Sequence, residues 1–310
     1  MILMKVKINY KRNLFKGYSG LCESIFCAPF EDPIKFKEED FENKRFDDLV
    51  NRGSEYLEYS SIEDCDYVFI PYKWDNRSMN SSLIINEAVS IGKKVISLHN
   101  DDYAPHSSLS SNEGYLFTTT LNSKTRKSNE FTLPAFTGDF FNNNENNINR
   151  KVGFCGAITH QIRSQVLSIL DSSNKINTDF VIRNSFWAHY EMTKDEARIG
   201  YMKNMIDNSF IMCMRGAGNF SYRLYETMMM GRIPIIIDSD QVFPFEKTID
   251  YSEFSIKIHT DNISNIENTL LDKISSLSDN DIIKMQNKSR EIWVEYLSPL
   301  GWIKNFQKEL

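Results

Sequence analysis

The sequence predicts an α/β protein built from two halves, each a parallel β-sheet covered by helices. Short apolar runs alternate along the chain with stretches of helical periodicity, which is typical of parallel strands joined by crossover helices. The alternation stops once, in the asparagine-rich stretch 138–151, and then starts again. Hydrophobic residues make up 41% of the 310 residues, so the chain has enough apolar surface for a sizeable core.

The first half is predicted to hold four strands and one helix. The helix spans residues 80–91, where Leu83, Ile84 and Ala88 follow helical spacing and Gly92 marks the end. Strands are predicted where apolar residues run together between polar turns, at residues 5–10, 66–71, 94–98 and 115–121.

The second half repeats this alternation. Strands are predicted at residues 152–155, 178–182, 209–214, 234–237 and 254–258. Helices are predicted at residues 159–170, 194–205 and 263–274, with a shorter helix that carries Arg223 and ends at Gly231. The last stretch, 279–310, is amphipathic and helical, with an interruption near Pro299.

These elements predict two Rossmann-like domains that face each other across a cleft. Residues 1–140 form the first domain, 141–150 a linker and 151–278 the second domain, and the helical tail 279–310 is able to return toward the first. Ligands of such sheets bind beyond the carboxyl ends of the strands.

Composition excludes several classes of function. The formal net charge is −6 without a long basic run, so a nucleic-acid partner is not expected. No run of about 18 apolar residues predicts a membrane span, and the first ten residues are too short and too charged for a signal peptide. The five cysteines are irregularly spaced, which favours a reducing compartment over a disulfide framework. We therefore expect a cytoplasmic protein.

The main functional signal lies at residues 214–240, where a glycine loop leads into a short helix. Gly216 and Gly218 allow the backbone to turn tightly and to approach a ligand. Asn219 or Ser221 can cap the helix that follows. The unpaired N–H groups at a helix start bind anions, so this loop is a candidate phosphate site.

Two arginines and one carboxylate accompany the loop. Arg215 and Arg223 are placed to clamp a diphosphate, and Glu226 is placed three residues after Arg223 to accept hydrogen bonds from ribose hydroxyls. The alternative is an exposed ion pair between Arg223 and Glu226, worth about 0.3–0.5 kcal/mol.

The block from Arg215 to Asp238, RGAGNFSYRLYETMMMGRIPIIID, resembles the exostosin (GT47-type) family of glycosyltransferases. Weaker similarities lie at residues 66–74 (DYVFIPYKW), 126–136 (RKSNEFTLPAF) and 152–163 (VGFCGAITHQIR). The resemblance implies a GT-B fold, a nucleotide-sugar donor on the second domain, an acceptor on the first and inversion at the anomeric carbon. Animal and plant members usually carry a membrane anchor, so a bacterial or viral glycan enzyme fits this chain better.

The expected reaction moves a hexosyl or pentosyl group from a UDP-sugar to a glycan hydroxyl. Departure of the nucleotide requires positive charge, which two arginines and the helix start supply without a metal ion. Arg163, on the helix after Gly156, can add a further charge. The donor-binding residues predicted in this way are Arg163, Arg215, Gly216, Gly218, Asn219, Phe220, Ser221, Tyr222, Arg223 and Glu226.

The base that accepts the proton of the acceptor hydroxyl is expected from the first domain. Candidates follow its strands, namely Asp102 as first choice, then Asp101 and Asp75. An Asx-turn is the alternative role for Asp101 and Asp102.

Three alternatives remain open at this point. Asp238 and Asp240 flank Ser239 in a triplet of the kind that holds Mn²⁺ or Mg²⁺ in metal-dependent transferases. A noncatalytic module that binds nucleotide sugars or glycans would also use such a loop. A dehydrogenase is disfavoured because no G-x-G-x-x-G follows the first strand.

Overall fold

The computed structural model describes residues 5–10, 25–31, 43–141, 146–184 and 192–310. It divides into two compact units. The first comprises Met1–Asp139, Gln241–Thr248 and Glu295–Leu310, and the second comprises Phe140–Asp240 and Ile249–Val294. Among the helices of the described part, none is long and apolar enough to cross a lipid bilayer.

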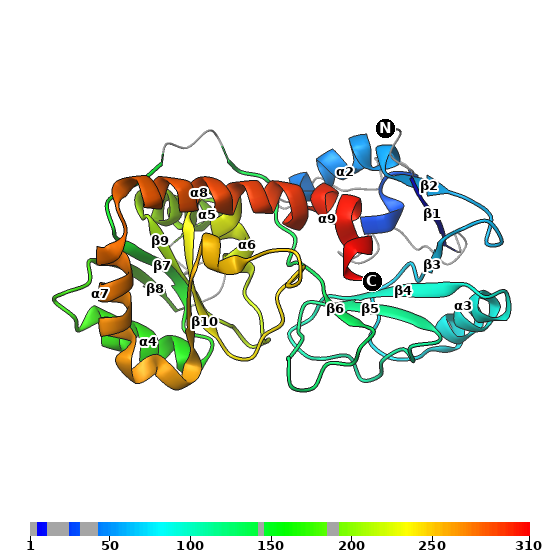
Figure 1. The fold of residues 1–310 in the computed structure, drawn as a ribbon, viewed down its shortest axis with the longest axis horizontal. Helices are drawn as coiled ribbons and strands as arrows, with labels where there is room; N and C mark the ends of the chain where they lie inside the picture. Colours follow the sequence, from blue (N-terminus) through cyan, green and yellow to red (C-terminus); the bar gives the residue numbers. More distant parts are fainter. Residues whose placement is uncertain (1–4, 11–24, 32–42, 142–145, 185–191) are drawn as a thin grey trace. The chain divides into compact units, whose positions relative to one another are not determined.

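The first unit is built on a six-stranded, all-parallel sheet of order β2-β1-β3-β4-β5-β6 (Figure 1). Its strands are β1 (Val6–Asn9), β2 (Leu57–Tyr59), β3 (Tyr67–Phe69), β4 (Lys94–His99), β5 (Gly114–Thr118) and β6 (Glu130–Thr132). Its helices include α2 (Asp47–Arg52), α3 (Met79–Ser90) and α9 (Pro299–Asn305). Helix α3 begins with a capping box between Ser78 and Ser81, and Gly92 follows its end at φ 75°, as predicted for that glycine.

The chain end packs into the first unit through aromatic side chains. Trp302 of α9 is fully buried, and its ring centre lies 5.1 Å from that of Phe117 and 5.6 Å from that of Phe26. Such edge-to-face pairs add to the free energy gained by burying the rings. The tail is therefore divided, because α8 (Asp279–Ile292) belongs to the second unit and the residues from Glu295 belong to the first.

The second unit has a five-stranded parallel sheet of order β11-β10-β9-β7-β8. Its strands are β7 (Val152–Ala157), β8 (Thr178–Arg183), β9 (Phe210–Cys213), β10 (Ile233–Asp238) and β11 (Ile256–His259). Its other helices are α4 (Gln161–Asp171), α5 (Lys194–Asp207), α6 (Tyr222–Met229) and α7 (Ile266–Ser276). The predicted α/β class, with two parallel sheets covered by helices, is confirmed.

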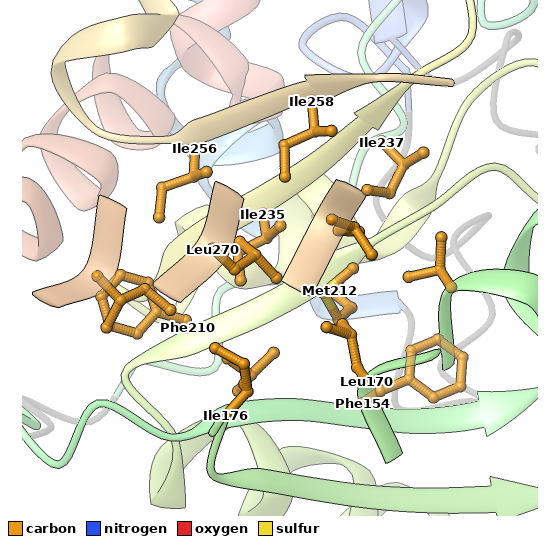
Figure 2. Packing of buried hydrophobic residues seen from close by; sticks show 14 of the residues in the cluster. Phe154, Leu170, Ile176, Phe210, Met212, Ile235, Ile237, Ile256, Ile258 and Leu270 are labelled. Atoms are coloured by element: carbon orange, nitrogen blue, oxygen red, sulfur yellow. The ribbon is translucent and has the colours of Figure 1, made fainter. Parts of the chain in front are cut away.

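Side chains of β10 alternate between the two faces of this sheet. Ile235 and Ile237 belong to the buried cluster that also holds Leu170 of α4 and Leu270 of α7 (Figure 2). Helices α6 and α8 pack against β10 and against each other. Figure 1 shows α4 with α7, and α6 with α8, as two helical layers around the sheet. Loops beyond the strand ends are thereby held in fixed positions.

Three short elements were not predicted, namely α2, β2 and β6. Strands β2 and β6 have three residues each, and only Leu57 and Thr132 among these are buried. A segment of three residues is too short to show an alternation of apolar and polar side chains, so the sequence does not predict it as a strand. Its position in the sheet depends on strands that are distant in the chain.

Residues 241–248 are bonded to the first unit. The backbone N–H of Val242 donates to Leu121 O at 3.2 Å, and the hydroxyl of Thr132 donates to Val242 O at 2.9 Å. The carboxylate of Glu309 accepts from the backbone N–H of Phe245. Burial raises the pKa of Glu309 to about 7.

Stability is expected to fall as the pH rises from about 4.5, the ordinary pKa of glutamate, to about 7. The folded chain keeps the Glu309 proton in this window while the unfolded chain releases it, so the free energy of unfolding decreases by up to about 1.4 kcal/mol per pH unit. Thermal unfolding between pH 4.5 and 8 measures this slope. In Glu309→Gln the slope should be smaller, and an unchanged slope would contradict the assignment.

Candidate functional site

The glycine loop leaves β9 at the carboxyl edge of the second sheet and ends at α6. The backbone N–H of Gly216 donates to Phe220 O at 3.3 Å, which closes the loop on itself. Ser221 precedes α6 in an extended conformation, and its side chain makes no capping bond. The start of α6 is therefore not capped by the side chain of its own N-cap residue, an arrangement suited to an anion.

Arg223 is buried near this helix start, with 7% of its surface exposed. Its Nη2 donates to Cys155 O of β7 at 2.8 Å, and its guanidinium lies 4.2 Å from the centre of the Phe154 ring. Its Nε and Nη1 have no hydrogen-bond partner among the residues that the structure describes. A buried cation with unpartnered N–H groups is costly, and an anionic ligand would satisfy them.

Glycine at position 156 makes room for this guanidinium. A Cβ atom there would lie 2.6 Å from Arg223 Nη2, and the backbone of Gly156 has φ 151°, which side-chain-bearing residues rarely adopt. Gly216 and Gly218 do not have positive φ angles. At Gly216 the absence of a side chain leaves space for Arg163, whose Nη2 would lie 3.4 Å from an added Cβ.

Glu226 pairs with α5 rather than with Arg223. Its Oε1 accepts from Arg198 Nη1 at 2.9 Å, and its Oε2 accepts from the Tyr201 hydroxyl. Burial, followed by the charge of Glu226, raises the pKa of Tyr201 well above its ordinary value, so Tyr201 stays a donor. The interpretation of Arg223 and Glu226 as an exposed ion pair is wrong, because both are buried and Glu226 bonds to Arg198.

Arg163 holds the loop together. Its three nitrogens donate to the carbonyls of Arg215 at 2.9 Å, Ala157 at 2.9 Å and Met214 at 3.1 Å. These carbonyls lie at or beyond the ends of β7 and β9, so Arg163 fixes two strand ends while keeping its charge beside the loop. Its direct contact with a donor stays a prediction.

Arg215 folds over its own loop. Its Nη2 donates to Ala217 O at 2.9 Å and its Nη1 donates to Asn219 Oδ1 at 3.3 Å. The Phe220 and Tyr222 rings lie side by side with centres 5.7 Å apart. The structure therefore gathers the predicted donor-binding residues at one edge of the second sheet.

Each residue of the triplet at the end of β10 contacts a neighbouring side chain. Asp238 Oδ2 lies 3.4 Å from Lys257 Nζ, Asp240 Oδ1 lies 3.5 Å from His259 Nε2, and the Ser239 hydroxyl donates to Asn219 Oδ1 at 2.6 Å. Within the described ranges no group of three or more His, Cys, Asp or Glu side chains is arranged to hold a metal ion.

The candidate bases lie at the carboxyl edge of the first sheet, after β3 and β4. The Asp101 carboxylate accepts from Lys73 Nζ at 2.5 Å, and its Oδ1 also accepts from the backbone N–H of Asp102 at 2.7 Å. The same Oδ1 accepts from the backbone N–H of Tyr103, two residues on, at 3.5 Å, which is the Asx-turn considered as the alternative role. The hydrogen bond from Lys73 lowers the pKa of Asp101, which weakens it as a base, while Asp102 is exposed on the same turn.

Asp75 lies beside a buried histidine. Its Oδ1 is 3.9 Å from His99 Nε2, and its side chain is 53% exposed. His99 Nδ1 lies 3.1 Å from Thr118 Oγ1, which in turn accepts from the backbone N–H of Thr120. Because a hydroxyl can both donate and accept, this contact is compatible with either neutral tautomer of His99, and one of the two carries its ring hydrogen on Nε2, the nitrogen that faces Asp75. Burial, followed by the charge of Lys73, lowers the pKa of His99 to about 4, so the ring is neutral.

Several of these partners were not found from the sequence. Arg198 and Tyr201 are three residues apart and therefore share one face of the predicted helix 194–205. This spacing was the one sequence feature that could have grouped them, but nothing near them in the sequence shows that they contact Glu226. Lys73 and Phe154 lie in segments that resemble the family and Thr118 lies in a predicted strand, but the sequence indicated no role for these three side chains.

Comparison with known proteins gives a family match and distant structural likenesses. The model of the Exostosin GT47 domain matches residues 60–274. No curated protein sequence matches the chain.

Among solved structures, a glycosyltransferase from Rickettsia africae ESF-5 has a TM-score of 0.46 at 11% identity, with 98% of each chain covered. TarM has a TM-score of 0.42 at 12% identity, covering 78% of this chain and 54% of TarM. A point mutant of S. aureus TarM in complex with fondaparinux, alpha-GlcNAc-glycerol and UDP has a TM-score of 0.40 at 10% identity, covering 78% of this chain and 55% of that chain. The chain thus spans about half the length of TarM.

Proposed function

The chain belongs to the exostosin GT47 family of glycosyltransferases, and from this premise we propose that it transfers a sugar from a UDP-sugar to a glycan hydroxyl with inversion. The observation that carries the proposal is the buried guanidinium of Arg223, whose Nε and Nη1 lack partners in the part of the chain that is described. A diphosphate at the start of α6 would supply acceptor oxygens for both nitrogens.

The same groups serve the chemical step. When the bond between the sugar and the diphosphate breaks, negative charge grows on the departing nucleotide. Arg223, the N–H groups at the start of α6 and the nearby charges of Arg163 and Arg215 are fixed in place before the reaction, so they stabilise this charge without reorganisation. Glu226, oriented by Arg198 and Tyr201, retains lone pairs for ribose hydroxyls.

We assign the base to Asp75 in preference to Asp102 and Asp101. Asp101 is paired with Lys73, whereas the carboxylate of Asp75 is half exposed and has a neutral His99 as its neighbour. The neutral imidazole adds no positive charge beside the Asp75 carboxylate, whereas Asp101 has the ammonium group of Lys73 as its partner.

A thermal-shift panel of UDP, GDP, CMP and their sugar derivatives tests the function. UDP and at least one UDP-sugar are expected to raise the melting temperature, since a ligand that binds only the folded state stabilises it by mass action. A shift with GDP or CMP in place of UDP would correct the nucleotide. The absence of a shift with any of them would contradict the proposal.

Activity is expected to persist in EDTA, because cationic side chains and the helix start provide the charge that a metal ion supplies in other transferases. The measurement is the transfer rate before and after EDTA treatment, with Mn²⁺ or Mg²⁺ added back. Complete loss in EDTA and recovery with Mn²⁺ would instead assign the metal to Asp238 and Asp240.

A further inference from the structure

Two further buried polar atoms beside the donor loop lack partners among the described residues. Asn219 is 6% exposed, and its Nδ2 makes no hydrogen bond. The Asp238 side chain is 14% exposed; its Oδ2 faces Lys257, whereas its Oδ1 is buried and makes no hydrogen bond. Each such group costs free energy unless a ligand completes it.

The orientation of the Asn219 amide is fixed by its neighbours. The guanidinium of Arg215 can only donate, so the amide atom 3.3 Å from Arg215 Nη1 must be the oxygen. The Ser239 hydroxyl donates to the same oxygen at 2.6 Å. The two hydrogens of Nδ2 therefore remain on the other side of the amide, available to a ligand.

The residues that carry these atoms are tied to a different strand of the sheet than Glu226. Arg223 bonds to β7, and Glu226 bonds to α5, which packs against β7. Asn219 is instead tied to Ser239, directly after β10. Strand β9, from which the loop leaves, lies between β7 and β10 in the sheet. A ligand with its diphosphate at Arg223 and its ribose at Glu226 would extend its other end toward Asn219 and Asp238.

We propose that Asn219 Nδ2 and Asp238 Oδ1 bind hydroxyl groups of the transferred sugar and thereby select the donor. This inference rests on the proposed function. The amide needs an acceptor and the carboxylate needs a donor, and a sugar hydroxyl can serve as either. A sugar with a missing or inverted hydroxyl would leave one of the two atoms unpartnered, which is the strongest basis for discrimination between similar substrates.

Isothermal titration with UDP alone and with UDP-glucose, UDP-galactose, UDP-N-acetylglucosamine and UDP-xylose tests the proposal. The quantity compared is the ratio of the Kd of UDP to the Kd of the tightest UDP-sugar. In Asn219→Asp and in Asp238→Asn this ratio is expected to fall about tenfold, the scale of one hydrogen bond to a buried charged or polar group. One variant adds a negative charge and the other removes one, so a loss in both cannot come from net charge.

Asp240→Asn is the matched control, since Asp240 belongs to the same triplet and faces His259. Its ratio is expected to equal that of the native chain. If native protein binds UDP but no UDP-sugar binds more tightly, or if both variants keep the native ratio, the sugar site is overturned while the proposed function stands. If native protein binds neither UDP nor any UDP-sugar, the proposed function fails and the sugar site fails with it.

Discussion

Replacement of Arg223 by methionine is expected to weaken UDP binding by more than tenfold. The native side chain places two nitrogens at the start of α6 that lack a partner among the described residues, and each charge-assisted bond to a phosphate oxygen contributes about 1.5–3 kcal/mol. Loss of a single such bond already corresponds to a factor of ten or more in Kd. Isothermal titration of UDP into the native and variant proteins measures the change.

The same variant separates a binding role from a structural one. Methionine fills a similar volume without a charge, so it removes a buried cation whose Nε and Nη1 are unpartnered in the described part of the chain. The ligand-free melting temperature of Arg223→Met should therefore be no lower than that of the native protein. Arg77→Ala, which removes an arginine paired with Glu113 in the first unit, serves as the control and should leave UDP affinity unchanged. Native UDP affinity in a folded Arg223→Met variant would refute the phosphate site.

Replacement of Gly156 by alanine is also expected to weaken UDP binding. Alanine at this position would bring its Cβ to 2.6 Å from Arg223 Nη2 and would force the backbone away from φ 151°. The guanidinium must then move, and UDP affinity should fall although no charged group has been removed. This variant tests position, whereas Arg223→Met tests charge.

Local sequence features predicted the glycine loop and its neighbouring elements in the second half of the chain. The loop, the helix that ends at Gly231 and the following strand were predicted because glycine, capping residues and an apolar run lie next to one another in sequence. The structure places Gly231 at φ 60°, directly after α6 and its cap residue, as helix termination requires.

Partner identities were not predictable, because they depend on contacts between distant residues. Arg223 meets Cys155 across 68 positions and Glu226 meets Arg198 across 28. The role of Arg163 was also underestimated, since its bonds to three carbonyls follow from how β7 and β9 end side by side. Sequence patterns identified which groups carry charge, whereas the fold decides which of those charges already have partners.

Replacement of Asp75 by asparagine is expected to lower the rate of sugar transfer by a factor of about 10²–10⁴, the usual contribution of a general base. Asparagine keeps the size of the side chain but cannot accept the proton of the acceptor hydroxyl. Affinity for UDP should remain native, because the residues proposed to bind it belong to the second unit. Transfer assays together with UDP titration measure the two effects separately, and loss of transfer with intact binding would exclude a noncatalytic sugar-binding module.

Asp102→Asn is the matched control for this experiment, since Asp102 lies on the turn after β4 and is exposed. Its transfer rate should stay within about twofold of native, as expected for a surface carboxylate outside the chemistry. The opposite result, with Asp102→Asn inactive and Asp75→Asn active, would return the base to Asp102.

Substitutions distinguish the role of Asp75 from that of its neighbour His99. Burial holds the pKa of His99 at about 4, so this imidazole stays neutral from about pH 5 upward and its charge does not change across the working range. If His99 were itself the base, Asp75→Asn would retain most of its activity and both His99 variants would lose theirs. If Asp75 is the base and His99 assists it as an N–H donor, His99→Gln, which retains a side-chain N–H donor, should preserve more activity than His99→Ala.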